Sequence, residues 1–449
     1  MNEIIKSVSN VVWGVPLIVL IMGTGLLMTV RTGGIQFLKL PYALKLAFFK
    51  KSDKTLTGDI SNFQSLMIAL AATVGTGNIV GVATAVVLGG PGALAWMWLS
   101  ALVGMVTKYS EAVLAVKYRI SDEKGNMAGG PMYYLENGLK QKWLGVLFAF
   151  FAVFASFGIG SGVQTNSMAE ALNSVFQISP YVTGVAVGVS VGIIILGGVS
   201  SISSVSSVFV PVMIVFYIGG AGYGLITHYE MIPQAFALIV SGAFSAEAFA
   251  GGMAGAAVRY GVARGIFSNE AGLGSAPIAA AAAKTNHPCQ QALVSMTQTF
   301  LDTIVVCSMT GFLLIIGGEY ASGLNGAALT SVTFDKLLGP YGGFIVAISL
   351  VTFAFSTVLG WSYYGERSAY YLFGKKGVLP YKICFVGFAT LGAFATNLNM
   401  VWDLSDIFNG LMAVPNLIGI IGLSGVVVKE TKDFLETLKQ DVKKEKTAA

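Results

Sequence analysis

The sequence predicts an all-α polytopic membrane protein with about eleven transmembrane helices. Of its 449 residues, 55% are hydrophobic and 11% are charged, whereas a soluble domain carries roughly 25% charged residues. Apolar stretches of the roughly 20 residues that cross a bilayer recur along the whole chain. Two of these stretches are interrupted by glycine-rich polar segments, at 71–81 and 267–277. These observations predict a protein that spans the membrane many times and contains two discontinuous helices.

The first predicted span, 11–30, follows a polar segment and is long enough to remain in the membrane, so it does not resemble a cleavable signal. The spans that follow it are bounded by loops rich in lysine, glycine and polar residues. We expect them near 60–88, 92–118, 143–175, 181–199, 204–226, 258–283, 290–317, 341–373, 378–396 and 400–427.

The two polar interruptions predict helices that break inside the membrane. The first, AATVGTGNIVG at 71–81, holds three glycines within seven positions, and each glycine costs about 1 kcal/mol relative to alanine in a helix. The second is FSNEAGLGSAP at 267–277. Interrupted hydrophobic segments in corresponding halves of a chain point to the binding site of a secondary transporter. Close helix packing is the alternative, but packing alone does not call for Asn78, Asn269 or Glu270.

The positions of the breaks predict an inverted repeat. With the first span set aside, the broken spans are the first and the sixth of ten. Five spans per half is an odd number, so the second half enters the membrane from the opposite side. We therefore divide the chain into an N-terminal span with an interfacial helix (1–56), a first repeat (57–230), a second repeat (231–428) and a charged tail (429–449).

Positive charge predicts the orientation. Lysines and arginines crowd the loops on one side, which makes that side cytoplasmic and places the N-terminus outside a cell membrane, with the C-terminal tail inside. Segments 35–49 and 130–139 mix apolar and polar residues, so we expect both to lie in the interface, with Tyr133 and Tyr134 at headgroup level. The cytoplasmic set is Arg31, Lys39, Lys45, Lys50, Lys51, Lys54, Lys117, Arg119, Lys124, Lys140, Lys142, Lys284, Lys375, Lys376 and the tail, against Lys6, Arg259 and Lys336 outside.

Several function classes are disfavoured. The cysteines Cys289, Cys307 and Cys384 are scattered, and only two histidines occur, so neither a disulfide framework nor a metal cluster is expected. An enzyme would need a catalytic pair in a span, and a channel would need repeated filter segments. The net charge of +5 is explained by the loops, so we expect no nucleic-acid partner. We infer no obligate protein partner, only a small-molecule substrate and the lipid bilayer.

The breaks can hold an amino acid without a charged side chain. The amides of Gly75, Thr76 and Gly77 start a half-helix, and such a helix terminus favours a carboxylate. Carbonyl groups freed at 267–271, from Phe267 through Ser268 and Asn269, can accept from an ammonium group. The sequence therefore predicts a zwitterion site where the two breaks meet.

Other polar and aromatic residues in the spans are further candidates. Gln164 and Thr165 are candidates for substrate contact, with hydrogen bonding between helices as the alternative. Phe157, Phe267 and Trp361 are bulky enough to close a small cavity, although an aromatic residue in a span usually belongs to the core.

Asp302, in TQTFLDTIVV, lies deep in a predicted span, where an ionisable residue is a functional candidate. The alternative is a structural partner for Asn78 or Lys108. Two further sets have helical or near-helical spacing and are expected to pair with one another, Lys108 with Glu111 and Arg264 with Glu270.

Three segments carry a resemblance to a known family. TVGTGNIVG, GGPGALAWMW at 89–98 and ARGIFSNEAGLGSAP at 263–277 resemble the alanine or glycine:cation symporter (sodium/alanine symporter) family, over nearly the whole chain. The resemblance implies the leucine-transporter (LeuT) type of fold, a five-plus-five inverted repeat, with one extra N-terminal helix. It also implies sodium-driven symport of small neutral amino acids, alanine or glycine, by alternating access. Proton-coupled symport is the nearest alternative.

The same resemblance implies where sodium binds. It places the ion between the carbonyls of Ala71 and Val74 and hydroxyls of the span at 341–373, where Ser356 and Thr357 match. The alternative is that both hydroxyls bond back to their own helix. Asp302 aligns with a sodium-ligand asparagine of that fold, which makes it a candidate for a second cation site or a proton site. The expected substrate-binding residues are Gly75, Thr76, Gly77, Asn78, Gln164, Thr165, Phe267, Ser268, Asn269 and Trp361.

Overall fold

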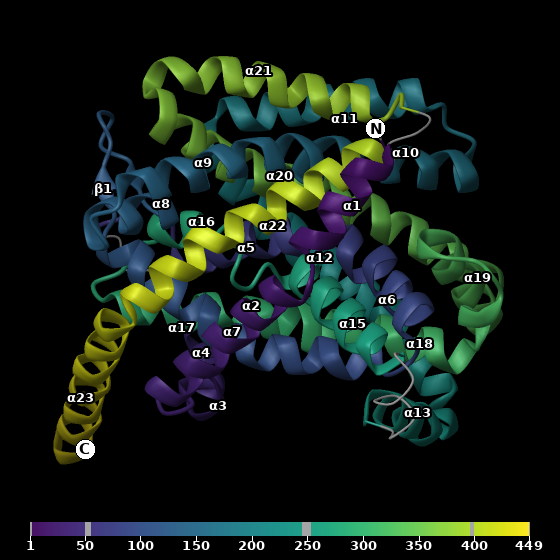
Figure 1. Ribbon diagram of the computed structural model, residues 1–449, viewed down its shortest axis with the longest axis horizontal. Coiled ribbons are helices and arrows are strands. Elements are labelled where there is room, and N and C mark those ends of the chain that lie inside the picture. Colours follow the sequence, from purple (N-terminus) through teal and green to yellow (C-terminus); the bar gives the residue numbers. More distant parts are fainter. Residues whose placement is uncertain (1, 50–54, 245–252, 396–398, 449) are drawn as a thin grey trace.

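The computed structural model describes residues 2–49, 55–244, 253–395 and 399–448, and these are almost entirely helical (Figure 1). One short antiparallel hairpin, β1 (Ile120–Ser121) with β2 (Met127–Ala128), interrupts the helices. The prediction of an all-α membrane protein is confirmed.

Within the described residues, seven helical spans are long and apolar enough to cross a membrane, or eight if the bent pair is one span. The count of eleven stays a prediction. The predicted span 181–199 is the 17-residue helix α11 (Pro180–Leu196), and 258–283 is divided between α15 (Met253–Asn269) and α16 (Pro277–Ala281). The long single helices are α2 (Val15–Arg31), α7 (Ala93–Lys117), α12 (Gly198–Thr227), α20 (Gly342–Phe373), α21 (Lys375–Gly392) and α22 (Asn399–Gly422).

The first predicted break is present. Helix α5 (Asn62–Thr73) begins at a capping box in which Ser61 and Gln64 bond each other's backbone N–H. After Thr73 the chain bends by 53° into η1 (Gly77–Gly81) and α6 (Val82–Gly89). A Cβ atom at position 75 would lie 2.4 Å from Thr357 Oγ1, so glycine allows the break to approach α20 closely.

The second predicted break follows α15. The helix ends at Asn269, and Glu270 adopts a positive φ of 56°. The chain resumes at α16, whose first residue is Pro277, the position at which a missing N–H does least harm. Both discontinuous helices expected from the sequence are therefore confirmed.

The segments that precede α5 and follow α16, away from the breaks themselves, are tied together. The amides of Asp59 and Ile60 donate to Ala282 O, and the amide of Lys284 donates to Ile60 O at 2.7 Å. Arg119 donates to carbonyl oxygens on both segments, including Thr57 O. Segments more than 200 residues apart thus share one backbone-bonded joint.

Three π-helical segments lie within the helices that surround the breaks, where such bulges often mark functional sites. One is η1, the second is η3 (Gly158–Gly162) between α9 (Lys142–Phe157) and α10 (Val163–Phe176), and the third is η5 (Phe300–Cys307) between α17 (Pro288–Thr299) and α18 (Ser308–Gly317). Helix α20 packs against α5, α9, α10 and α12, so it reaches the first break from the side.

The N-terminal helices α1 (Asn2–Val12) and α2 lie beside α22 on the near face of Figure 1, outside the helices that hold the breaks. Segment 35–49 is helical, as expected, in α3 (Ile35–Leu38) and α4 (Leu40–Phe49). The placement of Tyr133 and Tyr134 at headgroup level is wrong: both are buried, because α8 (Pro131–Tyr133) and η2 (Tyr134–Gly138) fold inward. The outer elements are η4 (Tyr229–Met231), α13 (Ile232–Phe244), η6 (Glu319–Ala321), α19 (Gly326–Leu338), η7 (Gly339–Tyr341) and α23 (Ser424–Ala448).

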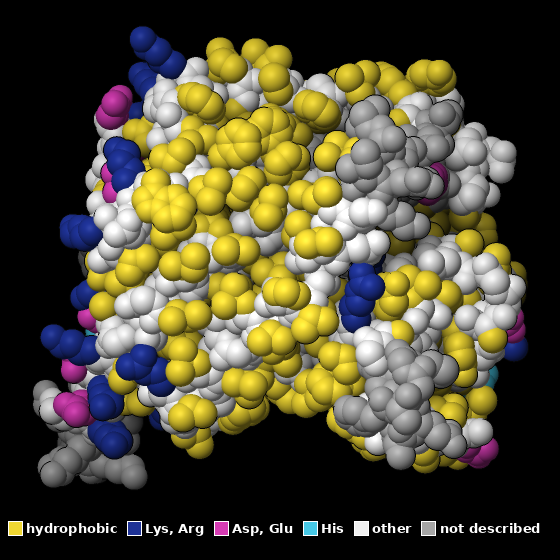
Figure 2. Space-filling view, viewed as in Figure 1, with side chains coloured by type: hydrophobic (Ala, Val, Ile, Leu, Met, Phe, Trp, Pro, Cys, Tyr) yellow, Lys and Arg dark blue, Asp and Glu magenta, His cyan; other side chains and the backbone are white. Residues whose placement is uncertain are grey.

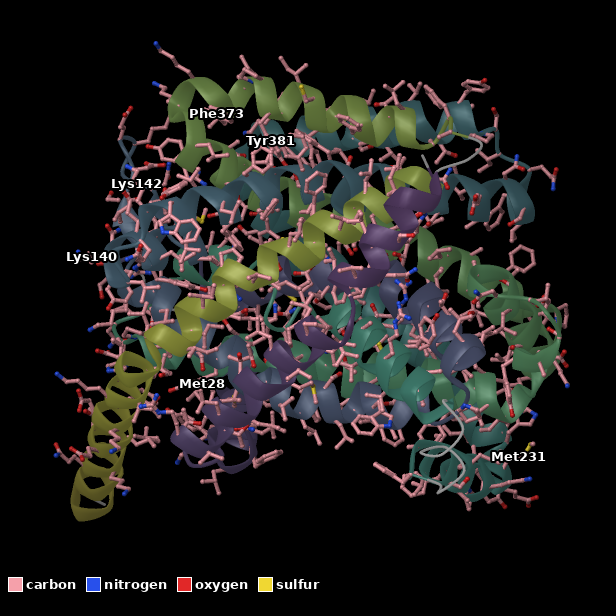
Figure 3. The ribbon with its side chains drawn as sticks, in the orientation of Figure 1. Met28, Lys140, Lys142, Met231, Phe373 and Tyr381 are labelled. Carbon is pink, nitrogen blue, oxygen red and sulfur yellow. The ribbon has the colours of Figure 1, made fainter. Side chains whose placement is uncertain are left out.

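Charge and apolar surface are separated along the molecule. Figure 2 shows hydrophobic side chains across the middle, with lysines, arginines and acids gathered at one edge, over β1 and α23. Figure 3 places Lys140 and Lys142 at that edge and Met231 at the opposite one. The distribution suits a membrane-spanning body, and the orientation and the repeat boundaries stay predictions.

Candidate substrate and ion site

A small cavity lies between the two breaks. Its volume is about 10 Å³, which is enough for about one water molecule. Five structural units contribute to its wall: the first break, the η3 region, the second break, α20 and α22. The lining residues are Ala72, Thr73, Gly75, Thr76, Gly77, Ile159, Gln164, Phe267, Glu270, Thr357, Trp361 and Asn409.

Three polar atoms of this wall have no hydrogen-bond partner among the described residues: Thr76 Oγ1, Gln164 Oε1 and Asn409 Oδ1. All three side chains are buried. The amide nitrogen of Gln164 donates to Ile159 O at 2.9 Å, which leaves its oxygen free. A buried polar group without a partner costs about 1–3 kcal/mol, so this cavity is built to receive a polar ligand.

Oxygen atoms from two distant spans meet beside the cavity. The Ser356 hydroxyl lies 3.2 Å from Ala71 O and 3.4 Å from Val74 O. Thr357 Oγ1 lies against the backbone of the same turn, next to Gly75. Both hydroxyls also donate to Phe353 O of their own helix, so back-bonding and proximity to the break occur together. Hydroxyl and carbonyl oxygens are hard donors, and this set suits a cation such as sodium.

Asp302 lies behind the cavity and joins the two breaks. Its carboxylate accepts hydrogen bonds of 2.8 Å from Asn78 Nδ2, Ser268 Oγ and Thr303 Oγ1. Asn78 belongs to the first break and Ser268 to the end of α15. The structure therefore places Asp302 as a partner of Asn78, and three donors already occupy its carboxylate.

The structure brings six of the ten predicted substrate residues to the cavity wall: Gly75, Thr76, Gly77, Gln164, Phe267 and Trp361. The side chains of the other four make hydrogen bonds behind it. Asn78 and Ser268 bond Asp302, Thr165 donates to Ser161 O, and Asn269 donates to Thr303. Phe157 stacks on Tyr381 and Phe388 instead of lining the cavity.

The expected pairing of Arg264 with Glu270 is wrong. Arg264 lies over the ring of Phe267, 5.4 Å from its centroid, and attracts Asp406. Glu270 accepts from Ser275 and faces Lys108. The left-handed backbone at position 270 turns the side chain out of the α15 path, so helical spacing from Arg264 no longer applies. Lys108 and Glu111 attract each other, but the described residues show no ion pair or hydrogen bond between them, and Lys108 Nζ has no hydrogen-bond partner there.

Five lining residues were missed as substrate contacts: Ala72, Thr73, Ile159, Glu270 and Asn409. Asn409 carried a signal, since it is a polar residue in the apolar span 400–427. Glu270 also carried a signal, since it is a charged residue within the second break, but we expected it to pair with Arg264. Ala72, Thr73 and Ile159 look like ordinary span residues.

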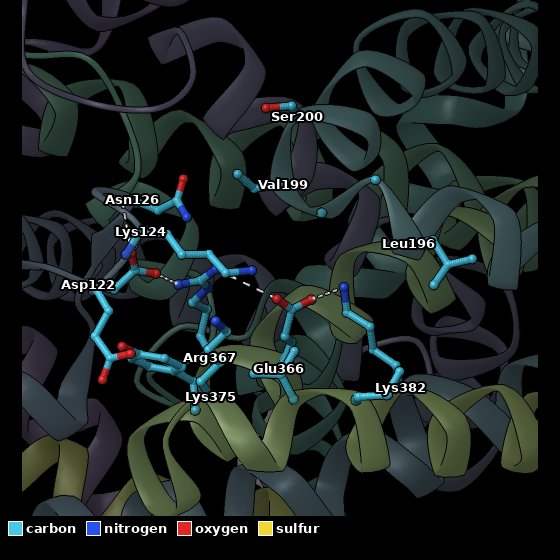
Figure 4. Close-up of a pocket in the computed structure, with 16 residues that line it drawn as sticks. Asp122, Lys124, Asn126, Leu196, Val199, Ser200, Glu366, Arg367, Lys375 and Lys382 are labelled. Carbon is cyan, nitrogen blue, oxygen red and sulfur yellow. Dashed lines mark hydrogen bonds and ion pairs between the residues drawn. The ribbon is translucent and has the colours of Figure 1, made fainter.

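A larger cavity of about 420 Å³ lies at the charged edge, away from the breaks (Figure 4). Arg367 of α20 forms an ion pair of 3.0 Å with Asp122, which follows β1, and lies 3.6 Å from Glu366. Lys382 of α21 pairs with Glu366 at 3.2 Å. Burial alone would raise the pKa of Asp122, but the hydrogen bonds from Arg367 and from the amides of Asn126 and Lys124 outweigh burial and lower it.

Two broken helices that meet at a buried polar cavity define a secondary transporter with a leucine-transporter type of fold. In agreement, the structure superimposes on the crystal structure of MhsT in complex with L-phenylalanine with a TM-score of 0.57 and 16% identity, covering 84% of this chain and 99% of that one. The chain belongs to the sodium:alanine symporter family, whose model matches residues 1–449.

Relatives support this assignment. The chain is 56% identical to the sodium/alanine symporter AgcS of Methanococcus maripaludis, over 98% of this chain and 99% of that protein. It is 38% identical to the probable sodium/glutamine symporter GlnT of Bacillus subtilis, over 97% and 91%. The family is one of transporters and not of enzymes, and the chain is a sodium-coupled amino-acid symporter.

Proposed function

We propose that this protein carries small neutral amino acids, alanine and glycine, together with sodium across the cell membrane by alternating access. The carrying observation is the cavity between the breaks, whose wall combines unpartnered polar atoms with Phe267, Ile159 and Trp361. The relative of 56% identity is named for alanine. A relative of 38% identity is named for glutamine, and in this chain we expect the bulky wall residues Phe267, Ile159 and Trp361 to limit the size of the substrate.

The carboxylate of the amino acid binds at the first break. Gly75 N already donates to Asn78 Oδ1 at 2.9 Å. The amides of Thr76 and Gly77 and the Thr76 hydroxyl therefore supply the donors, at the start of the η1–α6 half-helix. Asn78, held by Asp302, keeps this turn in shape. The cavity is small in this conformation, so its walls move apart when substrate enters.

Sodium binds between Ala71 O, Val74 O and the hydroxyls of Ser356 and Thr357. Carbonyl oxygens of the first break and hydroxyls of α20 then hold one ion between two parts of the molecule. Because the same break carries the substrate carboxylate, filling one site orders the other. One sodium that moves down 100 mV contributes about 2.3 kcal/mol to accumulation.

Orientation follows from the charged loops. The edge that carries β1, Lys140, Lys142 and α23 faces the cytoplasm, which places the N-terminus outside. The expected partners are the amino acid, sodium and the surrounding lipid.

The deciding experiment is uptake of labelled alanine into proteoliposomes of the full-length protein, under an imposed sodium gradient or an imposed proton gradient. We expect accumulation with sodium and none with protons alone. Accumulation driven by protons without sodium would favour proton-coupled symport, for which Asp302 is the candidate carrier. Glycine should compete, and leucine should not.

A further inference from the structure

Glu270 is the one charged side chain among the described residues that line the cavity. It is 3% exposed and sits directly after α15 with a φ of 56°, a conformation that glutamate rarely adopts. The Ser275 hydroxyl donates to its carboxylate and holds it in this position, and Trp361 lies beside it in the cavity wall. The fold thus strains its backbone to keep a carboxylate at the substrate cavity.

Lys108 lies near Glu270 and two further buried carboxyl groups. Lys108 is buried, its Nζ has no hydrogen-bond partner among the described residues, and it attracts three carboxylates, those of Glu111, Glu270 and Asp302. Glu111 accepts from Asn416 at 2.6 Å, and Asp302 accepts from three neutral donors. One lysine is thus shared among three buried carboxyl groups. Glu270 is the member of this set that a cation in the cavity can reach.

Two further acceptors share the cavity wall with Glu270. Gln164 Oε1 and Asn409 Oδ1 are buried at 2% and 1% exposure and have no partner among the described residues. An ammonium group has three N–H donors and no acceptor. One carboxylate and two amide oxygens match those three donors, whereas a hydroxyl group offers a single donor and a methylene group offers none.

We propose that Glu270 receives the ammonium group of the transported amino acid and thereby makes the cavity selective for amino acids over hydroxy acids and carboxylic acids. The proposal rests on the proposed function and names the residue that reads the amino group. Lys108 acts through Glu270 as a positioning residue, because its ammonium group attracts the Glu270 side chain. Gln164 and Asn409 accept the remaining donors.

The test compares L-alanine with L-lactate, which carries a hydroxyl in place of the ammonium group. Both are used as competitors of sodium-driven uptake of labelled alanine into proteoliposomes, and as ligands of the purified protein by calorimetry. The wild type should prefer alanine by at least about tenfold. Glu270→Gln keeps the shape of the side chain and removes its charge, so it should weaken the binding of alanine about tenfold or more. It should strengthen the binding of lactate, whose carboxylate no longer meets a second negative charge.

Opposite changes in the binding of alanine and lactate would show that Glu270 recognises the ligand. If Glu270 had only a structural role, its substitution would weaken the binding of both ligands. Glu270→Asp retains the charge and should keep the alanine preference. Glu170→Gln removes an exposed carboxylate of α10 that lies outside the cavity wall and is not attracted to Lys108, so it should leave the ratio unchanged. Equal weakening of both ligands in Glu270→Gln overturns the proposal, and so does a wild type that prefers alanine less than about tenfold, a result that needs no variant to fold.

Failure of the proposed function looks different. If the wild type carries no alanine, the assigned substrate is wrong. In that case Glu270→Gln should weaken binding of glutamine and strengthen binding of its hydroxy analogue. The absence of these opposite changes would overturn the role of Glu270.

Discussion

Asn78 donates from its side-chain amide to Asp302 twice, at 2.8 Å to the carboxylate and at 3.2 Å to the main-chain carbonyl. The same carboxylate accepts from Ser268 at the other break. Asp302 is thus a common partner for both interrupted helices, and its substitution should disturb the substrate and ion sites together.

We expect Asp302→Asn to raise the half-saturating concentrations of both alanine and sodium, each by about tenfold. The reason is that an amide cannot accept all three hydrogen bonds that the carboxylate accepts. Uptake measured against sodium concentration at several pH values checks this. Loss of the pH dependence with sodium dependence intact would instead identify Asp302 as a proton carrier.

Thr357→Ala should raise the sodium concentration for half-maximal uptake about tenfold, the effect of about 1.4 kcal/mol from one lost oxygen ligand. At saturating sodium, the apparent affinity for alanine should recover, since the amide donors at Thr76 and Gly77 remain. Linkage requires that sodium and alanine change each other's binding by the same factor. Thr352→Ala, on the same helix but away from the break, is the matched control. An unchanged sodium dependence in Thr357→Ala would remove the proposed ion site.

Trp361→Ala should let larger neutral amino acids compete with alanine, because the indole forms part of the cavity wall. The ring is packed closely: a Cβ at Gly160 would lie 2.4 Å from Trp361 Cβ. Truncation should also lower stability by about 3–5 kcal/mol, so Trp361→Leu serves as a milder second variant. Competition by leucine and glutamine is the measurement, with the exposed Trp143→Ala as control. A size preference that neither variant changes would contradict this role.

The Asp122–Arg367 ion pair predicts acid sensitivity. Because the pKa of Asp122 is lowered in the folded protein, its contribution is present above its unfolded pKa, about 3.9. The contribution is lost as pH falls through the folded value. Asp122→Asn should therefore lower the thermal midpoint at pH 7 and flatten its fall below pH about 4.

The Asp122–Arg367 pair is partly buried, so breaking it should cost more than the loss of a fully exposed pair, which is worth at most about 1 kcal/mol. The exposed Glu319–Lys336 pair is the control, and Glu319→Gln should change stability by at most about 1 kcal/mol. Equal effects of the two substitutions would show that burial of the Asp122 pair is unimportant.

Topology can be read by labelling single cysteines. Cys289 and Cys307 are buried and Cys384 is exposed, so the background is Cys384→Ser. A cysteine at Lys124 should react with an impermeant thiol reagent only from the cytoplasm, and one at Ser322 only from outside. Reaction of both from the same side would contradict the proposed orientation.

The sequence by itself determined the membrane class and the two breaks. Lipid offers no partner to freed backbone groups, so three glycines and Asn78 within the first break could only mean a helix that opens toward protein or ligand. The pair Ser356 and Thr357 was singled out by the family resemblance, since other serines and threonines lie in the same span. The membrane class and the breaks needed local composition and spacing alone, whereas the hydroxyl pair needed the resemblance to a family.

Only the tertiary structure decided which polar side chains face the cavity. Gln164 and Thr165 are neighbours, yet the first lines the cavity and the second bonds back to Ser161 O. Asn409 reaches the cavity from α22, and Glu270 faces Lys108 instead of Arg264. Helical spacing fixes which residues share a face, but it does not fix what packs against that face. The partners come from spans more than 100 residues away, and a left-handed residue such as Glu270 leaves the helical spacing altogether.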